Sequence, residues 1–343
     1  MIRYTIRRLL FGIVVLLSVT LAVFLLTGPV LQWRQNIDLA RAYAGKNPSA
    51  PQIQAASELL GLDKPYYTQF GLTVRRIVLG PSAEEKARLC PGSSEAECKR
   101  LVGHFGRSFV KTRSVDDLLR ERAPATFSLA LVAATMWLTM GVAVGILSAV
   151  RPRSLFDRGS TAFVLLGQSL PVYYFGLLGL YFLAYKWKIF PLGGYVPFDA
   201  QNPWPWLSHL LLPGITLAFQ FAAIYVRMTR ASVLGALSED YVRTARAKGA
   251  GERRVLVNHA LRNALLPIVT IFGLDLGTLL GGAILTEYTF GIAGIGRLTV
   301  EAARSFDIPL IAGVVLFSAF MIVIANIVVD LLYAVIDPRI RLA

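Results

Sequence analysis

Six long apolar blocks decide what this chain of 343 residues can fold into. A helix needs roughly 20 apolar residues to cross a bilayer core that is about 30 Å thick. The blocks occupy residues 9–30, 125–150, 160–185, 210–226, 264–286 and 308–336. Backbone polar groups in lipid must be hydrogen-bonded within their own segment, so each block is expected to be a helix. The sequence therefore predicts an all-α integral membrane protein with six transmembrane helices.

The composition excludes an ordinary soluble enzyme. Hydrophobic residues make up 55% of the chain and charged residues only 16%, whereas a soluble domain carries about 25% charged residues. The first block is longer than the apolar region of a secretory signal, which usually has roughly 7 to 15 residues, and no small-x-small cleavage site directly follows it. We interpret this block as a retained first helix.

The formal net charge of +14 indicates topology rather than nucleic-acid binding. If the N-terminus is cytoplasmic, the inner segments hold 16 basic residues and the two short outer loops hold four. Such a bias toward the cytoplasmic side is the usual signature of orientation. We therefore expect cytoplasmic N- and C-termini and no nucleic-acid partner. The inner basic residues are Arg3, Arg7, Arg8, Arg151, Arg153, Arg158, Arg227, Arg230, Arg243, Arg246, Lys248, Arg253, Arg254, Arg262, Arg339 and Arg341.

A polar segment separates the first two blocks, and helix signals recur in it. Ser49 begins a run that Gly61 ends, and Ser82-x-x-Glu85 and Ser94-x-x-Glu97 resemble capping boxes. We predict an extracytoplasmic helical insertion between helices 1 and 2. The chain then divides into residues 1–30 (N-terminal tip and first helix), 31–123 (extracytoplasmic subdomain) and 124–343 (five-helix core with a cytoplasmic loop at 227–263).

Both cysteines of the chain, Cys90 and Cys98, fall in this outer segment. The predicted topology places them outside the reducing cytosol, where disulfides persist. Pro91-Gly92 would turn the chain between them, and a bridge closing so short a loop would stabilise by roughly 2–3 kcal/mol. The alternative is a pair of unpaired thiols. A metal site is not indicated, because His104 is the only further ligand nearby.

The sequence carries no recognisable enzyme machinery. It has no G-x-x-x-x-G-K-[ST] phosphate loop and no H-E-x-x-H motif. Its three histidines, His104, His209 and His259, fall in different segments. The glycines at 291–296 lack the strand–turn–helix setting of a dinucleotide site. We therefore expect no catalytic residue, cofactor or metal ligand in this chain.

Polar residues inside the apolar blocks are candidates for a transport pathway. Ionisable groups in hydrocarbon are costly and usually face a bundle interior or a pathway. Asp275 is the deepest of Asp275, Glu287, Asn326 and Asp330, and it is our pathway candidate. Glu287 and Asp330 alternatively cap or pair near helix ends. Two small-x-x-x-small patterns, at Gly141/Gly145 and Gly277/Gly281, predict close helix packing.

The longest inner loop, residues 227–263, is rich in helix-forming residues around one glycine hinge. It predicts two short helices on either side of Lys248-Gly249-Ala250-Gly251, because glycine permits a sharp change of direction. The alternatives are a structured docking element and a solvated basic loop, and the density of helix formers favours the first.

This loop resembles that of a known transporter family. Residues 238–249 (SEDYVRTARAKG) and 259–267 (HALRNALLP) are similar to the inner loop of dipeptide and oligopeptide ABC importer permeases. In that family the loop carries a degenerate Glu-Ala-Ala motif whose short helix docks on the cytoplasmic ATPase. Alignment on Gly249 places Arg243, Thr244 and Ala245 in those three slots, and only the second alanine is kept. The peptide branch shows the same departure.

The resemblance extends over nearly the whole chain. Departures are Thr27-Gly-Pro29 after the first helix, Ile292-Ala293 in place of Trp-Pro, and the stretch around Cys90 and Cys98, which looks inserted. The matching segments, in the family's order, are residues 4–10, 60–65, 169–171, 192–195, 227–230, 287–290 and 337–339.

The resemblance implies a type I ABC importer permease that moves dipeptides or oligopeptides across the inner membrane of a bacterium or archaeon. Its implied partners are a second homologous permease in a heterodimer, two ATPases that bind ATP and Mg²⁺, an extracytoplasmic binding protein, a peptide and membrane lipid. The alternatives are nickel chelates or glutathione as substrates, a secondary transporter, or a channel. The implied coupling residues are Asp240, Tyr241, Arg243, Thr244, Ala245, Ala247 and Gly249.

Overall fold

The computed structural model describes residues 2–29, 61–82, 103–108 and 110–336, with a few further positions between 38 and 57. In this part of the chain the regular structure is helical, and the only β-type pairing is two isolated bridges at residues 103–114. Four of the described helices are long and apolar enough to cross a membrane, or six segments if each of two bent pairs is one span. This confirms the all-α membrane fold.

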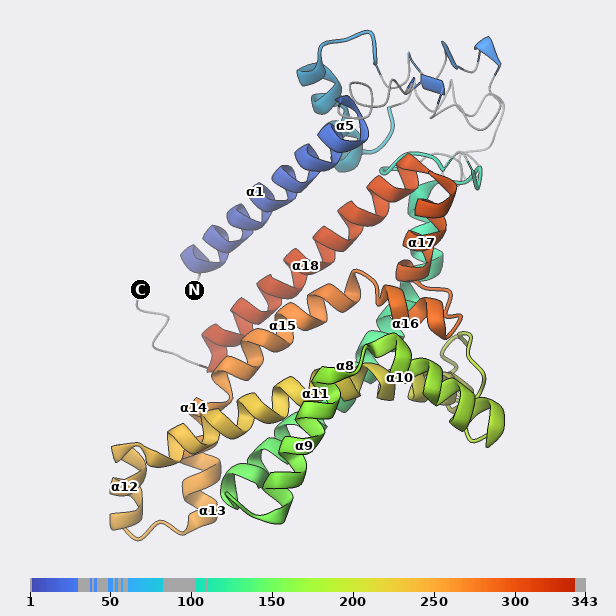
Figure 1. The fold of residues 1–343 in the computed structure, drawn as a ribbon. Coiled ribbons are helices and arrows are strands. Elements are labelled where there is room, and N and C mark those ends of the chain that lie inside the picture. The colour runs from blue at the N-terminus through green and yellow to red at the C-terminus, as the bar shows by residue number, and fades with distance from the viewer. Residues whose placement is uncertain are drawn as a thin grey trace. The chain divides into compact units, whose positions relative to one another are not determined.

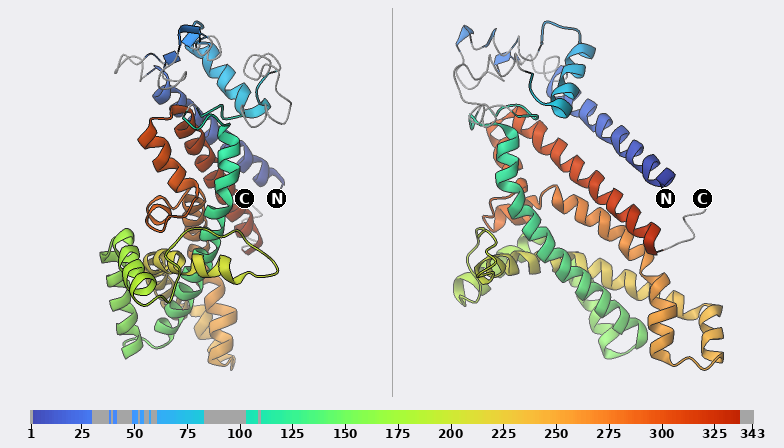
Figure 2. Two further views of the ribbon diagram at one scale, coloured as in Figure 1. Left: turned by 90° about the vertical axis from the view of Figure 1, so that its right-hand side faces the viewer. Right: turned by 180° about the vertical axis from the view of Figure 1, so that it is seen from behind.

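The chain divides into two compact units. The first consists of residues 125–293 and 324–343, and the second of residues 2–124 and 294–323. In the first unit, α9 and α11 pack along each other (Figure 1, Figure 2). The elements of the first unit are most of α8 (Val115–Val150), α9 (Leu155–Ser169), α10 (Val172–Gly179), the π-helix η1 (Leu180–Lys186), α11 (Trp204–Ser238), α12 (Asp240–Ala247), α13 (Glu252–Arg254), the π-helix η2 (Val255–Ala260), α14 (Leu261–Ala264), α15 (Leu266–Leu280), α16 (Ile284–Thr289) and the end of α18 (Ile308–Ile336).

The core of the first unit surrounds Trp137 of α8, which is completely buried. Its ring stacks on Phe221 of α11 with 4.8 Å between centroids. Gly145 lets the same two helices touch, because a Cβ there would lie 2.5 Å from the Thr229 Cβ and 2.9 Å from the Val226 carbonyl oxygen. The packing role predicted for Gly141-x-x-x-Gly145 is confirmed. The role of Gly277-x-x-x-Gly281 stays a prediction.

The third predicted span, residues 160–185, was wrong as a single helix. The structure breaks it into α9 and the α10–η1 arm, which are bent by 102°. Pro171 causes the break, because it has no N–H and disfavours helical backbone in the residue before it. Leu170 accordingly adopts φ −96° and ψ 126°, an extended conformation.

The other predicted bounds fit to different degrees. Residues 308–336 coincide with α18, whereas the block 210–226 is only the middle of α11 (Trp204–Ser238). The block 264–286 is interrupted after α15, where Gly282 has a φ of 125°, before α16 begins. Apolar composition therefore marks the membrane part of a helix, while the helix itself continues into polar residues.

The second unit contains α1 (Ile2–Thr27), α5 (Tyr66–Leu79), the start of α8, α17 (Ile295–Ser305) and the start of α18. Phe24 of α1 meets Phe70 of α5 edge to face at 5.6 Å. Gly61 has a φ of 62°, in keeping with the helix stop predicted there. A second apolar core joins the start of α8 to α17 and α18 through Val115, Leu118, Leu119, Ala123, Ile295, Leu298, Ala302, Leu310 and Val314.

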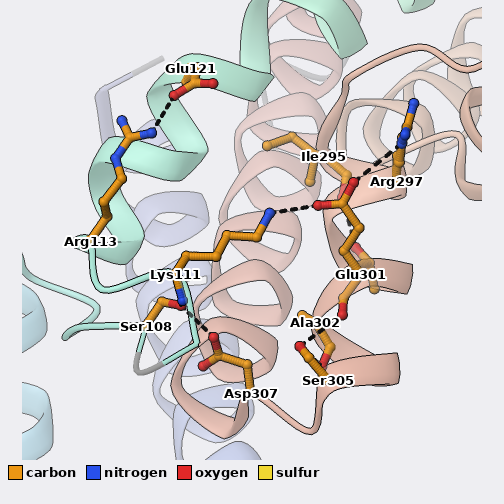
Figure 3. Close-up of polar contacts among 11 residues, drawn as sticks. Ser108, Lys111, Arg113, Glu121, Ile295, Arg297, Glu301, Ala302, Ser305 and Asp307 are labelled. Carbon is orange, nitrogen blue, oxygen red and sulfur yellow. Dashed lines mark hydrogen bonds and ion pairs between the residues drawn. The ribbon is translucent and has the colours of Figure 1, made fainter.

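Polar contacts tie the loop before α8 to α17 and α18 in this unit (Figure 3). The Ser108 hydroxyl donates to the buried carboxylate of Asp307, and Lys111 Nζ lies 2.6 Å from the Glu301 carboxylate. Burial alone would raise the pKa of the Glu301 carboxyl, but the hydrogen bond and charge of Lys111 hold that pKa below its usual value. The loop is thus held to the C-terminal half of α17 and to the residue just before α18.

Several predictions fall on residues outside the described ranges. Residues 83–102 lie outside the described part of the chain. They include Cys90 and Cys98, Glu85 of the first capping box and the whole second capping box, Ser94-x-x-Glu97. Their disulfide and caps stay predictions, as does the division of the chain at residues 30 and 123.

Candidate functional site

The loop between α11 and α15 folds as two helical arms, as predicted. Glu239, with φ −71° and ψ 152°, interrupts the helix between α11 and α12. The second arm is formed by α13, η2 and α14 in succession, and it runs back beside α12 (Figure 1, Figure 2). The residues that join the two arms are Lys248, Gly249, Ala250 and Gly251. We call the whole of residues 239–264 the coupling loop.

Gly249 closes α12 with a left-handed turn. Its φ is 80°, and its N–H donates to the Arg246 carbonyl at 2.9 Å. The Ala250 N–H donates to the Ala245 carbonyl at 3.1 Å. This pair of bonds is the Schellman arrangement, which requires the glycine position to have a positive φ. Apart from Gly249 itself and its two chain neighbours, no atom of the described residues lies within 4 Å of where a Gly249 Cβ would be. A side chain there would be limited by backbone strain and by whatever docks on the loop.

An ion pair spans the turn. Arg246 Nε and Nη2 lie 2.8 Å and 3.0 Å from the two carboxylate oxygens of Glu252. The Arg246 side chain is exposed, and this two-bond contact fixes the end of α12 to the start of α13. Opposite charges on the two sides of a predicted glycine turn were the signal that could have revealed the pair.

The inner face of the coupling loop is packed onto the spanning helices. Val242 of α12 and Val255 of η2 are fully buried. The second arm joins α8 and α11 through an apolar cluster that we call the anchor cluster. Its buried members are Ala149, Val233, Ala236, Ala260 and Ala264, with Ile146, Leu234, Leu237, Leu256 and Leu261 around them. A displacement of the loop would therefore be transmitted directly to α8 and α11.

The predicted coupling residues lie mostly on the outer face. Of the seven, Ala245 is half-buried, so it lies at the edge of the exposed face rather than with Gly249. Tyr241 is exposed, but its hydroxyl accepts a hydrogen bond from Asn263 Nδ2 at 3.2 Å, which links α12 to α14. The exposed members are Asp240, Tyr241, Arg243, Thr244, Ala247 and Gly249.

An ion pair between a half-buried arginine and a buried aspartate lies at the start of α9. Arg230 of α11 donates to Asp157 from Nε at 2.5 Å and from Nη2 at 2.8 Å, and Asp157 is only 5% exposed. The Arg153 N–H adds a third bond to this carboxylate at 2.8 Å. Sequence reasoning counted both arginines as topology signals and missed the pair, because the partners are 73 positions apart.

Two of the four polar residues predicted inside the spans, Asp275 and Glu287, have defined partners. Asp275 of α15 is half-buried and accepts a hydrogen bond from the Tyr225 hydroxyl of α11 at 2.8 Å. Glu287 of α16 is completely buried and accepts one from the Thr126 hydroxyl of α8 at 2.7 Å. Asp330 lies in α18, but its side chain is outside the described part. Asp275 remains the better pathway candidate, because Glu287 is closed off by its neighbours.

Two of the short segments that carry the family resemblance meet in space. The Gly194 N–H donates to the Phe290 carbonyl at 2.9 Å, which joins residues 192–195 to residues 287–290. Gly193, with a φ of 129°, lies so close to the same carbonyl that a Cβ would overlap it. The Tyr195 hydroxyl lies 3.2 Å from that of Ser128 on α8. These glycines are therefore explained by close backbone approach.

Comparison with known proteins gives a consistent result. A family model described as the inner membrane component of binding-protein-dependent transport systems matches residues 141–342, and the model for the N-terminal part of such components matches residues 1–130. The "Probable peptide ABC transporter permease protein y4tP" of Sinorhizobium fredii is 36% identical over 98% of this chain and 99% of its own. The "Dipeptide transport system permease protein DppB" of Escherichia coli K12 is 34% identical over 99% of each chain.

A solved transporter structure has the same fold. A chain of the MetNI methionine ABC transporter, in an inward-facing conformation, matches with a TM-score of 0.52 at 18% sequence identity. The match covers 64% of this chain and 96% of that one.

Proposed function

The chain belongs to the family of binding-protein-dependent transport system inner membrane components, and we propose that it is the permease subunit of an ATP-driven importer of peptides. It is a multi-pass inner membrane protein. Full-length relatives named for peptide and dipeptide transport support peptides as the substrate class. The observation that carries the proposal is the coupling loop, which has an exposed outer face and an inner face packed onto α8 and α11.

The coupling loop would act as a lever. The turn at Gly249, the Arg246–Glu252 pair and the Tyr241–Asn263 hydrogen bond hold its two arms as one body. An ATPase that seats on the outer face and moves on ATP binding would displace that body. The anchor cluster would pass the displacement to α8 and α11, which is a rigid-body switching motion. The pathway would then alternate between opening outward and opening inward.

The partners follow from this mechanism. The coupling loop supplies a docking face but no phosphate-binding motif, so we assign ATP and Mg²⁺ to two cytoplasmic ATPases. A second, homologous permease would complete the pathway, and an extracytoplasmic binding protein would deliver the peptide. Asp275, on α15 and half-buried, is the residue we propose for the pathway. Nickel chelates and glutathione are the alternative substrates. Competition by unlabelled peptide for the uptake of labelled peptide would exclude them.

Co-purification tests the ATPase assignment. When the tagged chain is extracted in mild detergent from cells that express its operon, two copies of ATPase per permease pair should elute with it. A secondary transporter or a channel would elute without ATPases and would move substrate in their absence, which contradicts the proposal.

The proposed orientation has its own test. Reporters that are active on only one side of the membrane should show cytoplasmic placement when fused after Arg262 and extracytoplasmic placement when inserted near Gly92. The reason is the excess of basic residues in the segments assigned to the inside. Finding both reporters on the same side would contradict the six-span arrangement.

A further inference from the structure

The exposed face of the α10–η1 arm carries side chains of a different kind from those that α1 and α18 expose. Positions 173, 177, 181 and 185 recur at four-residue intervals and so form one stripe along the helix. Tyr173 is 48% exposed, Leu177 52%, Tyr181 54% and Tyr185 64%. We call these four residues the aromatic face. The opposite side is buried, with Ala184 3% exposed and Gly176 packed near the Phe290 ring.

The spanning helices α1 and α18 expose a different set of side chains. The exposed large residues of α18 are Val315, Phe320, Ile324, Val328 and Leu331, and those of α1 are likewise aliphatic or phenylalanine. None of these carries a polar tip. Tyrosine and tryptophan, by contrast, gather where a bilayer meets water, because the ring is apolar and its end is polar. The aromatic face therefore suits the interface and not the hydrocarbon core.

The geometry of the bend agrees with an interfacial position. α9 has 15 residues and is about 22 Å long at 1.5 Å per residue, so it already crosses most of a bilayer core of roughly 30 Å. The arm after it is bent by 102° and runs nearly perpendicular to α9. If α9 crosses the membrane, the arm lies along its surface. Stacking of Phe175 on Phe219 of α11, at 4.4 Å, fixes this direction.

Two further features point to lipid as the partner of this face. Lys186, the last residue of η1, and Lys188 are both exposed and flank Trp187, which is 58% exposed. Their ammonium groups complement lipid phosphates. Leu165 and Leu166, at the end of α9, are 61% and 57% exposed. Exposed apolar side chains therefore extend along α9 to within a few residues of the arm.

We propose that α10 and η1 lie flat in the outer interface of the bilayer, with the aromatic face on lipid headgroups and the first acyl carbons and with Lys186 and Lys188 on phosphates. The assignment of the arm to the outer side of the membrane rests on the orientation proposed above. Its flat position in the interface does not depend on that orientation. The third crossing is then made by α9 alone, and the arm anchors the outer end of α11 at a fixed depth.

Spin labels measure that depth. Cys90 and Cys98 are first replaced by serine, and single cysteines are introduced at the four positions of the aromatic face, with Tyr174 as a spare exposed position. The assembled transporter is reconstituted in lipid nanodiscs. Each label's depth is read from its relative collision rates with molecular oxygen and with a water-soluble nickel chelate. Labels at Val315, Phe320, Ile324 and Val328 on α18 are the matched control.

The four labels on the arm should report the same shallow depth to within about 5 Å, while the α18 labels spread over about 20 Å at 1.5 Å per residue. Three results would overturn the proposal. A steady gradient along the arm would make it the outer half of a span. High exposure to the nickel chelate at all four positions would place the face in a water-filled pathway. Exclusion of both reagents would mean that a protein subunit covers it.

Discussion

Replacement of Gly249 by valine should abolish peptide uptake while the chain still inserts in the membrane. Gly249 holds a φ of 80° in the turn that closes α12. A side chain with a Cβ costs roughly 1–2 kcal/mol in this left-handed conformation, and a β-branched one is worse. The Schellman bonds of the turn would be lost, and the two arms would no longer move as one body. Uptake of labelled peptide and the amount of ATPase that co-purifies both measure the effect.

Two matched variants separate strain from bulk. Gly251 lies two residues away with φ −66° and ψ 152°, and its Cβ position is also open. Gly251→Val should therefore leave uptake close to wild type. Gly249→Asn should retain much of it, because asparagine tolerates positive φ. If Gly249→Val transports at the wild-type rate with its ATPases bound, the coupling loop is not the coupling element. If Gly249→Asn fails like valine, bulk against the ATPase is the cause.

Substitution of Gly145 by leucine should prevent the first unit from folding. Its Cβ would already lie 2.9 Å from the Val226 carbonyl oxygen, and backbone cannot move aside without separating α8 from α11. Overpacking of a tight core costs typically 1–3 kcal/mol and more when backbone is displaced. Because Trp137 and Phe221 stack in the same contact, their packing would be lost as well. We expect aggregated protein on size exclusion after detergent extraction.

Gly235 provides the control for this change. It lies in α11 and is exposed, and no described atom outside its own helix backbone and its two chain neighbours lies within 4 Å of its Cβ position. Gly235→Leu should extract as a monodisperse protein with unchanged or slightly higher thermal stability, since glycine within a helix costs roughly 0.5–1 kcal/mol relative to alanine. Equal behaviour of the two leucine variants would contradict the close α8–α11 contact.

The sequence could predict those features that depend on residues close together along the chain. The block 308–336 coincides with α18 because its apolar residues fill the helix from end to end. The turn at Gly249 was predictable because a glycine after a helix-forming run is a local signal. The break at Pro171 was also local, but its proline lies inside an apolar block, and hydrophobicity alone concealed it.

The contacts that were missed are those between distant segments. Asp157 and Arg230 are separated by 73 positions, and Tyr225 and Asp275 by 50. No periodicity or spacing links such pairs, because the packing of α9, α11 and α15 brings them together. The half-buried position of Ala245 likewise depends on tertiary packing, since contacts with η2 and α11 decide which side of this short helix is covered. An arginine can be a topology signal in the sequence and also the partner of a buried carboxylate in the structure, as Arg230 is.

Peptide uptake by reconstituted transporter tests the central claim most directly. Proteoliposomes that hold the chain with its second permease and two ATPases are mixed with the binding protein and a labelled dipeptide or oligopeptide. Accumulation should require ATP, Mg²⁺ and the binding protein together, and it should disappear with Gly249→Val but persist with Gly251→Val. Accumulation that is driven by an ion gradient alone, or that continues unchanged without ATP, would contradict the assignment of this chain as the permease of an ATP-driven importer.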